Sequence, residues 1–322
     1  MTSKRILLIH TGGTIGMVRS THGFRPEVGI VEAEAARLCR DDFPNVSIEV
    51  KRLEPLIDSA NATPEDWNRI TGTIEDEYST FDGFVVTHGT DTLTFTSAAL
   101  TMALQALDKP VILTGSMLPL TEPDNDGRGN LRDALLAVQT SKPGVWVQFA
   151  GKLLHGARVR KTHSDTFDAF AAVPTDAPPM RRGDHFQRYT YGQHEVAILP
   201  VAPGATGAVL RYAAEHCDGI VLRCFGSGTV PNTPELVAAL KTCLERNVPM
   251  IAVSQCPEGR IALGTYAAGA ILTQHKVGDG RDMTMEAAYV KMVMALSAEG
   301  DINDIRTFLT TPLCGEISAK TA

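Results

Sequence analysis

Cysteine is scarce in the sequence and never occurs in a C-x-x-C arrangement. This spacing disfavours a structural zinc site and a thioredoxin-like redox motif. The six cysteines are scattered along the chain, at positions Cys39, Cys217, Cys224, Cys243, Cys256 and Cys314. In a chain of 322 residues without a secretory signal, scattered cysteines are expected to be reduced core residues rather than a disulfide framework.

Long hydrophobic runs and a cleavable leader are also lacking. No stretch approaches the ~18 apolar residues that a membrane-spanning helix requires, and Met1–Arg5 leads directly into the strand-like residues Ile6–Ile9. A signal peptide would instead place an apolar region before a cleavage site of small residues. We therefore expect a cytoplasmic protein that does not bind membranes.

Neither sign of charge dominates the sequence. There are 37 acidic and 30 basic residues, the net charge is −7, and no block of five or more like charges occurs. A protein that binds the phosphate backbone of nucleic acids would favour a basic surface. The composition therefore disfavours DNA and RNA as partners.

Known phosphate-binding and metal-binding motifs are absent. His10 stands where the first glycine of a G-x-G-x-x-G loop would be, and neither G-x-x-x-x-G-K-[ST] nor H-E-x-x-H occurs. The segment Cys224–Gly228 misses the G-x-S-x-G elbow of serine hydrolases by one residue. A nucleotide-binding domain, a zinc hydrolase and a serine hydrolase are therefore disfavoured, and no metal ion or organic cofactor is expected.

What the sequence does contain is an alternation of short β-rich apolar runs and stretches of helical periodicity, which indicates stacked βαβ units. Strands are predicted over residues 5–10, 47–53, 83–88, 110–114, 145–149, 196–201, 219–224 and 248–253. Helices are predicted over residues 31–40, 92–107, 129–140, 205–216, 233–246 and 285–298, and from Thr63-Pro64 to about Tyr78. Continuous apolar runs such as Val111–Leu113 indicate strands that are covered on both faces, and hence a parallel sheet.

A change of composition divides the chain. Between residues 173 and 195 the sequence is rich in proline and polar residues, which is typical of a linker. We therefore expect an N-terminal catalytic α/β domain over residues 1–185 and a C-terminal α/β domain over residues 196–322.

Hydroxyl-bearing residues and glycines gather directly after four consecutive predicted strands. They lie in the segments Thr11–Gly16, Leu56–Ser59, Thr87–Thr92 and Thr114–Met117. Ligands of open α/β sheets bind at the carboxyl ends of the strands. The four segments are therefore predicted to line one crevice.

This pattern favours a hydroxyl nucleophile at a glycine turn. Gly12-Gly13-Thr14 could expose a threonine hydroxyl, and Gly89-Thr90-Asp91 could offer a second hydroxyl beside a carboxylate. A threonine hydroxyl is a weak nucleophile at neutral pH, so it needs an adjacent base, either a histidine or a lysine with a lowered pKa. Lys161, which follows the fifth predicted strand, is the candidate base.

Two segments carry a resemblance to a known family. Thr11–Gly16 and His88–Thr92 resemble the two threonine motifs of the L-asparaginase family. Further matches follow in chain order, at Asp58-Ser59, Lys109–Val111, Thr114–Ser116, Asp126-Gly127, Asn130-Leu131, the Lys161 segment and Gly280–Glu286. The resemblance covers essentially the whole chain, and Gly16-Met17 and Asp282–Thr284 are similar to the bacterial cytoplasmic, or type I, branch of the family.

The resemblance implies a fold, an assembly and an activity. Members have an N-terminal doubly wound domain with a flavodoxin-like parallel sheet, and a smaller C-terminal α/β domain. They assemble as homodimers or homotetramers, with active sites near the contact between subunits. The implied reaction converts L-asparagine to L-aspartate and ammonia, with glutaminase activity as a minor reaction.

The resemblance also implies roles for individual residues. Thr14 matches the nucleophile that forms the acyl-enzyme. The members of a second catalytic trio are matched by Thr90, Asp91 and Lys161. The substrate pocket of the family corresponds here to Asp58, Ser59, Gly13, Gly89 and Ser116. Of these, Asp58 and Ser59 match the residues that receive the α-amino and α-carboxylate groups of the substrate.

Two positions depart from the family pattern. Some family members carry a tyrosine in the loop after the first motif and use its phenol beside the nucleophile. Phe24 stands at this position here. The proton of Thr14 must then be removed by another group, such as a water molecule or the Lys161 trio. Ala60 stands where many members place a polar residue that helps to hold the substrate carboxylate. The loop Met17–Gly29 has the composition of an active-site lid.

Two other functions fit the same motifs. One is the amidase subunit of a tRNA-dependent amidotransferase, which is disfavoured because the chain begins at its first strand and is acidic. The other is a non-catalytic asparagine- or aspartate-binding module, which Phe24 makes conceivable. A pure binding module has no need for both a nucleophile and a base, so the presence of Thr14 and Lys161 favours the enzyme.

Overall fold

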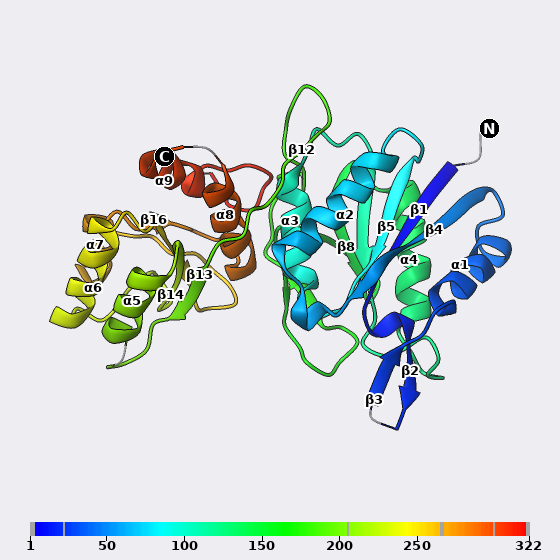
Figure 1. Cartoon of the computed structure of the whole chain (residues 1–322), viewed down its shortest axis with the longest axis horizontal. Helices are drawn as coiled ribbons and strands as arrows, with labels where there is room; N and C mark the ends of the chain where they lie inside the picture. Colours follow the sequence, from blue (N-terminus) through cyan, green and yellow to red (C-terminus); the bar gives the residue numbers. More distant parts are fainter. Residues whose placement is uncertain (1–3, 22, 205, 265–266, 299, 320–322) are drawn as a thin grey trace. The chain divides into compact units, whose positions relative to one another are not determined.

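The computed structural model describes residues 4–21, 23–204, 206–264, 267–298 and 300–319. Its contacts divide the chain into two compact units, which are drawn in Figure 1. The first unit consists of Met1–Ala172 and Ala177–Tyr189, and the second of Val173–Asp176 and Thr190–Ala322. Each unit has its own sheet, in which most or all strands are parallel.

The core of the first unit is a six-stranded sheet with the order β4-β1-β5-β7-β8-β9. Its strands are β1 (Lys4–Gly12), β4 (Val46–Ile57), β5 (Gly83–Thr87), β7 (Pro110–Thr114), β8 (Gly144–Phe149) and β9 (Lys152–His155). The first five strands along the chain are parallel, whereas β9 pairs with β8 in the antiparallel direction. Numbered along the chain, the parallel strands have the order 2-1-3-4-5 that is typical of flavodoxin-like doubly wound folds. The predicted fold class is therefore confirmed.

Helices cover both faces of this sheet. They are α1 (Ile30–Asp41), α2 (Pro64–Glu77), α3 (Leu93–Ala103) and α4 (Gly127–Thr140). Successive side chains of β1 point to opposite faces. Ile6 and Leu8 therefore pack with residues of α1 and α4, whereas Leu7 and Ile9 pack with residues of α2 and α3. This two-sided burial explains the continuous apolar run at the start of the sequence.

Local sequence signals predict one helix start correctly and overextend another helix. α2 begins at Pro64, and Thr63 and Asp66 form the reciprocal capping box that the sequence predicts. The predicted helix over 92–107 is wrong at its C-terminal end, because α3 ends at Ala103. The chain continues there as β6 (Leu104–Gln105), which pairs with β12 (Gln187–Arg188). Local periodicity cannot show this pairing, because the partner strand comes from the proline-rich segment that is distant in the sequence.

Two further short antiparallel pairs were not predicted. β2 (Met17–Ser20) and β3 (Gly23–Pro26) form a hairpin directly after the 3₁₀ turn η1 (Thr14–Gly16). β10 (Val159–Lys161) pairs with β11 (Phe170–Ala172). These strands are three or four residues long, which is too short for an alternating apolar pattern to reveal them.

The second unit contains a four-stranded parallel sheet with the order β13-β14-β15-β16. Its strands are β13 (Val196–Pro200), β14 (Gly219–Cys224), β15 (Met250–Ser254) and β16 (Gly278–Asp279). Its helices are α5 (Thr206–His216), α6 (Pro234–Glu245), α7 (Ala267–Gln274), α8 (Met285–Ser297) and α9 (Ile302–Thr310). The three strands predicted in this part of the chain are confirmed, whereas α7 and α9 were not predicted. Residue 205, which the prediction placed in a helix, lies outside the described residues.

All six cysteines are free, as the sequence predicts. Burial raises the pKa of Cys224 to about 12 and that of Cys243 to about 11. Such thiols stay protonated and are poor nucleophiles. Cys256 is exposed, so the expectation that the cysteines are core residues is wrong at this position.

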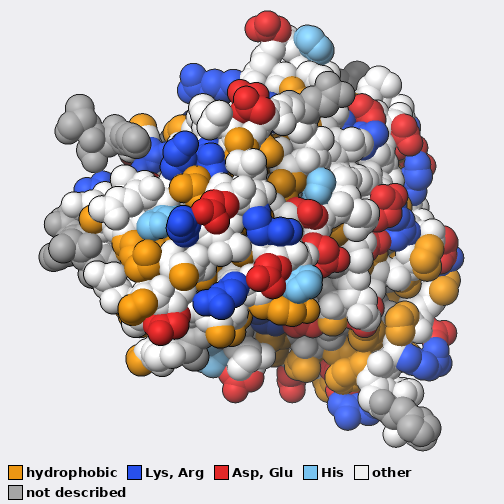
Figure 2. Space-filling view, turned by 60° about the vertical axis from the view of Figure 1, so that its left-hand side comes forward, with side chains coloured by type: hydrophobic (Ala, Val, Ile, Leu, Met, Phe, Trp, Pro, Cys, Tyr) orange, Lys and Arg blue, Asp and Glu red, His pale blue; other side chains and the backbone are white. Residues whose placement is uncertain are grey.

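Charged side chains of both signs are interspersed over the face of the molecule that Figure 2 shows. This distribution agrees with the sequence, in which neither sign dominates. In the part of the chain that the structure describes, no helix combines the length and the apolar composition that crossing a membrane requires.

Candidate active site

The glycine turn after β1 lies directly against the glycine turn after β5. Gly13 has a φ of +87°, a backbone conformation that glycine adopts without steric cost. A Cβ atom on Gly13 would lie 2.5 Å from the backbone nitrogen of Gly89 and 2.7 Å from its Cα atom. Only a glycine at position 13 therefore allows the two predicted motif loops to approach this closely.

The segment after β4 contacts the Gly89 turn. A Cβ atom on Gly89 would overlap the side chain of Ser59. The hydroxyl of Thr92 donates a hydrogen bond of 2.7 Å to the backbone carbonyl of Ser59. The structure thus brings Gly13, Gly89 and Ser59 together at the carboxyl ends of β1, β5 and β4.

Thr14 begins the 3₁₀ turn η1, directly after Gly13. Its side chain is partly exposed, whereas the following residues Ile15 and Gly16 are buried. The amide of Gly16 donates to the carbonyl of Gly13 at 3.2 Å and closes the turn. The hydroxyl of Thr14 is therefore presented on a turn whose other residues are fixed in the protein.

Lys161 contacts both side chains of its predicted trio. Its ammonium donates a hydrogen bond of 3.0 Å to the hydroxyl of Thr90 and lies 3.3 Å from a carboxylate oxygen of Asp91. Lys161 is the last residue of β10, and its pairing with Phe170 of β11 fixes the direction of the segment. Thr90 is buried and Asp91 is exposed, so the trio extends from the protein interior to the solvent.

Asp58 presents a carboxylate at the end of β4. Its side chain accepts hydrogen bonds from the amide of Ala60 at 3.2 Å and from the side-chain amide of Asn61 at 2.9 Å. These bonds fix an exposed carboxylate in one orientation. Such a group can pair with a substrate ammonium, and the exposed Ala60 beside it adds no polar side chain.

The loop after β7 is fixed by two residues for which the sequence suggested no role. The carboxylate of Asp126 accepts hydrogen bonds from the amides of Met117 and Leu118, and Asn130 donates to the carbonyl of Gly115 at 3.0 Å. The loop carries Ser116, whose buried hydroxyl has no hydrogen-bond partner among the described residues. Both residues lie in the matched segments 126–127 and 130–131, and only their contacts show that they position this loop.

His88 holds the Gly89 turn in place through hydrogen bonds of its ring. It is fully buried, and burial lowers its pKa, so the imidazole is neutral. Its Nδ1 lies 2.8 Å from the carbonyl oxygen of Gly89, which can only accept, so Nδ1 carries the proton. Nε2 then accepts a hydrogen bond of 3.0 Å from the hydroxyl of Thr96. Both ring nitrogens are thus occupied in holding the turn, a role that no pattern in the sequence indicates.

The hairpin β2–β3 follows the Thr14 turn and is joined to the loop after β7. Arg19 forms an ion pair of 3.0 Å with Glu122, and its guanidinium lies 5.3 Å from the ring centre of Phe24. The amide of Glu27 donates to the carbonyl of Gly16 at 3.0 Å. Phe24 is 41% exposed, so its ring lies on a solvent-accessible strand.

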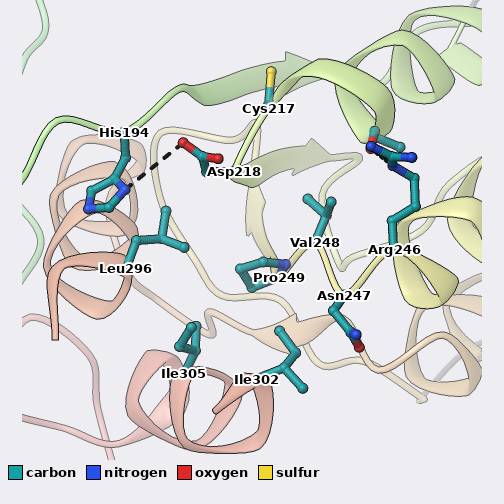
Figure 3. A pocket seen from close by; sticks show the side chains of 11 residues that line it. His194, Cys217, Asp218, Arg246, Asn247, Val248, Pro249, Leu296, Ile302 and Ile305 are labelled. Atoms are coloured by element: carbon teal, nitrogen blue, oxygen red, sulfur yellow. Dashed lines mark hydrogen bonds and ion pairs between the residues drawn. The ribbon is translucent and has the colours of Figure 1, made fainter. Parts of the chain in front are cut away.

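A separate pocket of about 430 Å³ lies within the second unit (Figure 3). It is lined by His194, Ala214, Cys217, Asp218, Arg246, Asn247, Val248, Pro249, Leu296, Ile302 and Ile305. Asp218 and Pro249 directly precede β14 and β15, so the pocket lies at the amino ends of these strands, whereas ligands of α/β sheets bind at the carboxyl ends. None of the predicted site residues lines it.

Within the described residues, no group of three or more His, Cys, Asp and Glu side chains is placed to hold a metal ion.

Comparison with known proteins covers nearly the entire chain. Residues 5–188 match the family model "Asparaginase, N-terminal", and residues 195–309 match "Glutaminase/Asparaginase C-terminal domain". L-asparaginase 1 of Escherichia coli K12 is 36% identical, with 99% of both chains covered. The crystal structure of L-asparaginase I from Vibrio cholerae is 31% identical and has a TM-score of 0.88, with 98% of this chain and 99% of that chain covered.

A relative with a different name matches the same residues. A glutamyl-tRNA(Gln) amidotransferase subunit of Thermococcus kodakarensis is 30% identical over 98% of this chain and 77% of its own length. The two family models nevertheless span both units, and both their descriptions name asparaginases. The chain belongs to the asparaginase family.

Proposed function

We propose that this protein is an L-asparaginase that converts L-asparagine to L-aspartate and ammonia. The observation that carries the proposal is the contact of Lys161 with Thr90 and Asp91. These two residues lie in the loop after β5, which packs directly against the turn bearing Thr14. This arrangement supplies a hydroxyl on a fixed turn, together with a second hydroxyl, a cation and a carboxylate beside it. The Escherichia coli relative, which matches over 99% of both chains, is named L-asparaginase 1.

The proposed reaction has two steps. The hydroxyl oxygen of Thr14 attacks the side-chain amide carbon, the C–N bond breaks, and ammonia leaves with the hydroxyl proton. This step forms a β-aspartyl ester on Thr14. Water then adds to the ester carbon, the C–O bond to Thr14 breaks, and L-aspartate is released while Thr14 regains its proton.

Lys161 and Asp91 organise proton movement in this proposal. The ammonium of Lys161 donates to the Thr90 oxygen. The hydroxyl proton of Thr90 then points away from Lys161 and toward the reacting groups. Asp91 lies beside the cation and holds it in place. Because Phe24 has no hydroxyl, we assign transfer of the Thr14 proton to a water molecule that this trio orients, which passes the proton to the departing amide nitrogen.

Substrate recognition is assigned to the carboxyl ends of β4, β1, β5 and β7. Asp58, with its fixed carboxylate, pairs with the α-ammonium of the substrate. Ser59 is assigned to the α-carboxylate, and the substrate lies along the Gly13–Gly89 contact with Ser116 at the end of the pocket. Glutamine is one methylene longer, a difference that binding alone discriminates by only ~1–3 kcal/mol. We therefore also propose glutaminase activity as a minor reaction.

We further propose that the protein works in the cytoplasm as a homodimer or a homotetramer. The sequence similarity of Gly16-Met17 and Asp282–Thr284 to the type I branch supports both parts of this proposal. Light scattering coupled to size-exclusion chromatography measures the mass in solution. A monomer that has full activity would contradict the assembly.

A second candidate is the amidase subunit of a tRNA-dependent amidotransferase. The relative from Thermococcus kodakarensis that is named as an amidotransferase subunit is the observation that favours it. The two candidates differ in what the reaction needs: an asparaginase hydrolyses the free amino acid, whereas an amidotransferase passes the ammonia to a charged tRNA. Asparagine turnover without any tRNA supports the first candidate.

The experiment that tests the proposal measures ammonia release from L-asparagine and L-glutamine. The unmodified protein is compared with Thr14→Ala, which removes the hydroxyl, and with Thr14→Ser, which keeps it. Turnover that is lost in the first variant and partly kept in the second supports the threonine nucleophile. Binding of L-aspartate is measured in parallel by calorimetry. An unmodified protein that binds aspartate but releases no ammonia shows that the proposal is wrong and leaves the binding module and the amidotransferase subunit as candidates.

A further inference from the structure

His10 is a buried histidine that the proposed chemistry does not use. It lies in β1, just before the glycine turn, and is 2% exposed. Its Nδ1 lies 2.8 Å from the hydroxyl oxygen of Thr87, the residue beside it on the neighbouring strand β5. The hydrogen bond therefore ties the carboxyl end of β1 to that of β5.

The neighbouring Cε1–Nε2 bond of the ring lies against the Thr14 turn. A Cβ atom on Gly16 would lie 2.9 Å from Cε1 and 3.0 Å from Nε2 of His10, and the first of these distances is shorter than real Cβ contacts. Gly16 is the last residue of the 3₁₀ turn that begins with Thr14. The imidazole thus supports the turn from inside the protein, and the absence of a side chain at position 16 lets it do so.

Each partner of His10 is adjacent to one of the two threonine motifs. Thr87 is followed directly by His88-Gly89-Thr90, and Gly16 closes the turn that presents Thr14. A second hydrogen bond, of 2.7 Å, runs from the hydroxyl of Thr11 to the carbonyl of Thr87. β1 and β5 are therefore joined by two side chains at the level where both motif loops leave the sheet.

We propose that His10 is a positioning residue that sets the placement of the Thr14 turn relative to the Gly89–Thr90 loop. It does not touch the substrate. Its Nδ1 contacts Thr87 and its Cε1–Nε2 bond lies against Gly16, so a change in the ring displaces one motif relative to the other. The inference deepens the proposed function, on which its kinetic part rests.

Reaction rates respond strongly to such displacements. A misplacement of reacting groups by about 1 Å can lower the rate about 100-fold, even when the change lies away from the reacting atoms. Asp58 and Ser59 bind the substrate from another strand end, β4. Gly13 and Gly89, which line the proposed substrate path, move with the two loops, so loss of the His10 contact should lower kcat more than it raises KM.

The test uses paired variants that separate the hydrogen bond from the shape of the side chain. His10→Phe keeps a ring but removes Nδ1, whereas His10→Asn keeps a polar atom near the position of Nδ1. Thr87→Val removes the partner hydroxyl with little change of volume, whereas Thr87→Ser keeps it. Thr71→Val is the matched control, because Thr71 is also buried and its hydroxyl bonds only to backbone carbonyls of α2.

We expect His10→Phe and Thr87→Val to lower kcat by about 10- to 100-fold, with a smaller change in KM. His10→Asn and Thr87→Ser should recover part of the loss, and Thr71→Val should behave as the unmodified protein. Unchanged kcat in folded His10→Phe or Thr87→Val would overturn the inference. So would a loss in Thr71→Val as large as that in Thr87→Val, because the effect would then be general destabilisation.

A second readout does not depend on asparagine turnover. Hydrogen–deuterium exchange of the amides in residues 13–16 and 88–90 reports the order of both loops in the absence of substrate. We expect faster exchange in both segments for Thr87→Val and unchanged exchange for Thr71→Val. If the unmodified protein releases no ammonia, the proposed function fails but this comparison still decides the inference. Unchanged exchange in both segments would overturn it.

Discussion

The two units use polar side chains differently, although both are built on parallel sheets. In the first unit, polar groups gather at the carboxyl edge of the sheet, and the trio around Lys161 reaches the solvent through Asp91, whose side chain is 63% exposed. In the second unit, Lys291 and Glu316 form an ion pair in which both side chains are fully buried. A buried pair cannot meet a substrate, so its contribution is structural.

The contacts of Glu316 show what the buried pair holds. Its carboxylate accepts hydrogen bonds from the amide of Leu313 at 3.1 Å and from that of Cys314 at 2.8 Å. Burial by itself would raise the pKa of Glu316, but Lys291 and these amides lower it, so the carboxylate stays ionised. The pair thus anchors the C-terminal segment on α8. The comparison teaches that a charged cluster indicates chemistry only when part of it remains open to solvent.

Removal of the lysine in the open cluster should have the largest effect on activity. Lys161→Met deletes the cation that contacts Thr90 and Asp91, and loss of a group that organises proton transfer lowers rates by about 100- to 10,000-fold. Ammonia release measures this loss. Lys152→Met removes a lysine from an exposed ion pair in the same unit and should leave activity unchanged. Equal activities of the two variants would contradict the role of Lys161.

Removal of the lysine in the buried cluster should instead reduce stability. Lys291→Met leaves Glu316 buried without its partner, which costs about 3–5 kcal/mol in the free energy of unfolding. Urea unfolding measures this change. The double variant Lys291→Met with Glu316→Gln removes the unpaired charge and should recover part of the stability. If the double variant is no more stable than the single one, the charge on Glu316 is not the cause.

Acidification should destabilise the first unit through its buried histidines. Burial lowers the pKa of His10 and of His88 below 6.5; around His10, Glu32 and Glu54 oppose this change and Arg52 adds to it. As the pH falls below about 6.5, the unfolded chain binds protons that the folded protein does not bind. The free energy of unfolding therefore decreases, by up to ~1.4 kcal/mol per pH unit for each histidine, until the folded pKa is reached.

This pH dependence can be assigned with two variants. Urea unfolding is measured between about pH 7.5 and 5.5 for the unmodified protein, for His10→Asn and for His163→Asn, whose side chain is exposed. We expect a smaller decrease in stability for the first variant and an unchanged decrease for the second. A stability that does not change over this range in the unmodified protein would show that the histidines are not buried as neutral groups.

The smallest effect is expected at the exposed ion pair of the β2–β3 hairpin. Arg19 is 72% exposed and Glu122 is 21% exposed, so solvent and salt screen their attraction. Arg19→Gln should leave the thermal unfolding temperature unchanged and alter kcat/KM by less than about threefold. A larger loss of kcat/KM at low salt, together with equal kcat/KM of the unmodified and variant proteins at high salt, would mean that the ion pair controls the hairpin electrostatically.

Much of the fold could be predicted because the relevant signals are local. The strands at 110–114 and 219–224 have the predicted ends, since their apolar runs are bounded by polar and turn residues. The capping box at Thr63 likewise places the start of α2. The predicted helix over 92–107 extends too far because the apolar Leu104 continues the helical periodicity, whereas its pairing with the distant Arg188 makes the backbone extended.

The sequence by itself determined the alternation of strands and helices, the two threonine motifs and the family resemblance that they carry. The resemblance grouped Lys161 with Thr90, but the spacing of these residues could not show their contact, because they are 71 positions apart and belong to different elements. Nor could the sequence show that His10 joins Thr87, 77 positions away, to the turn of Thr14. Strand order and side-chain packing decide such contacts, because they depend on which non-local surfaces bury together. The chemical groups are written in the sequence, but only the tertiary structure sets the distances between them.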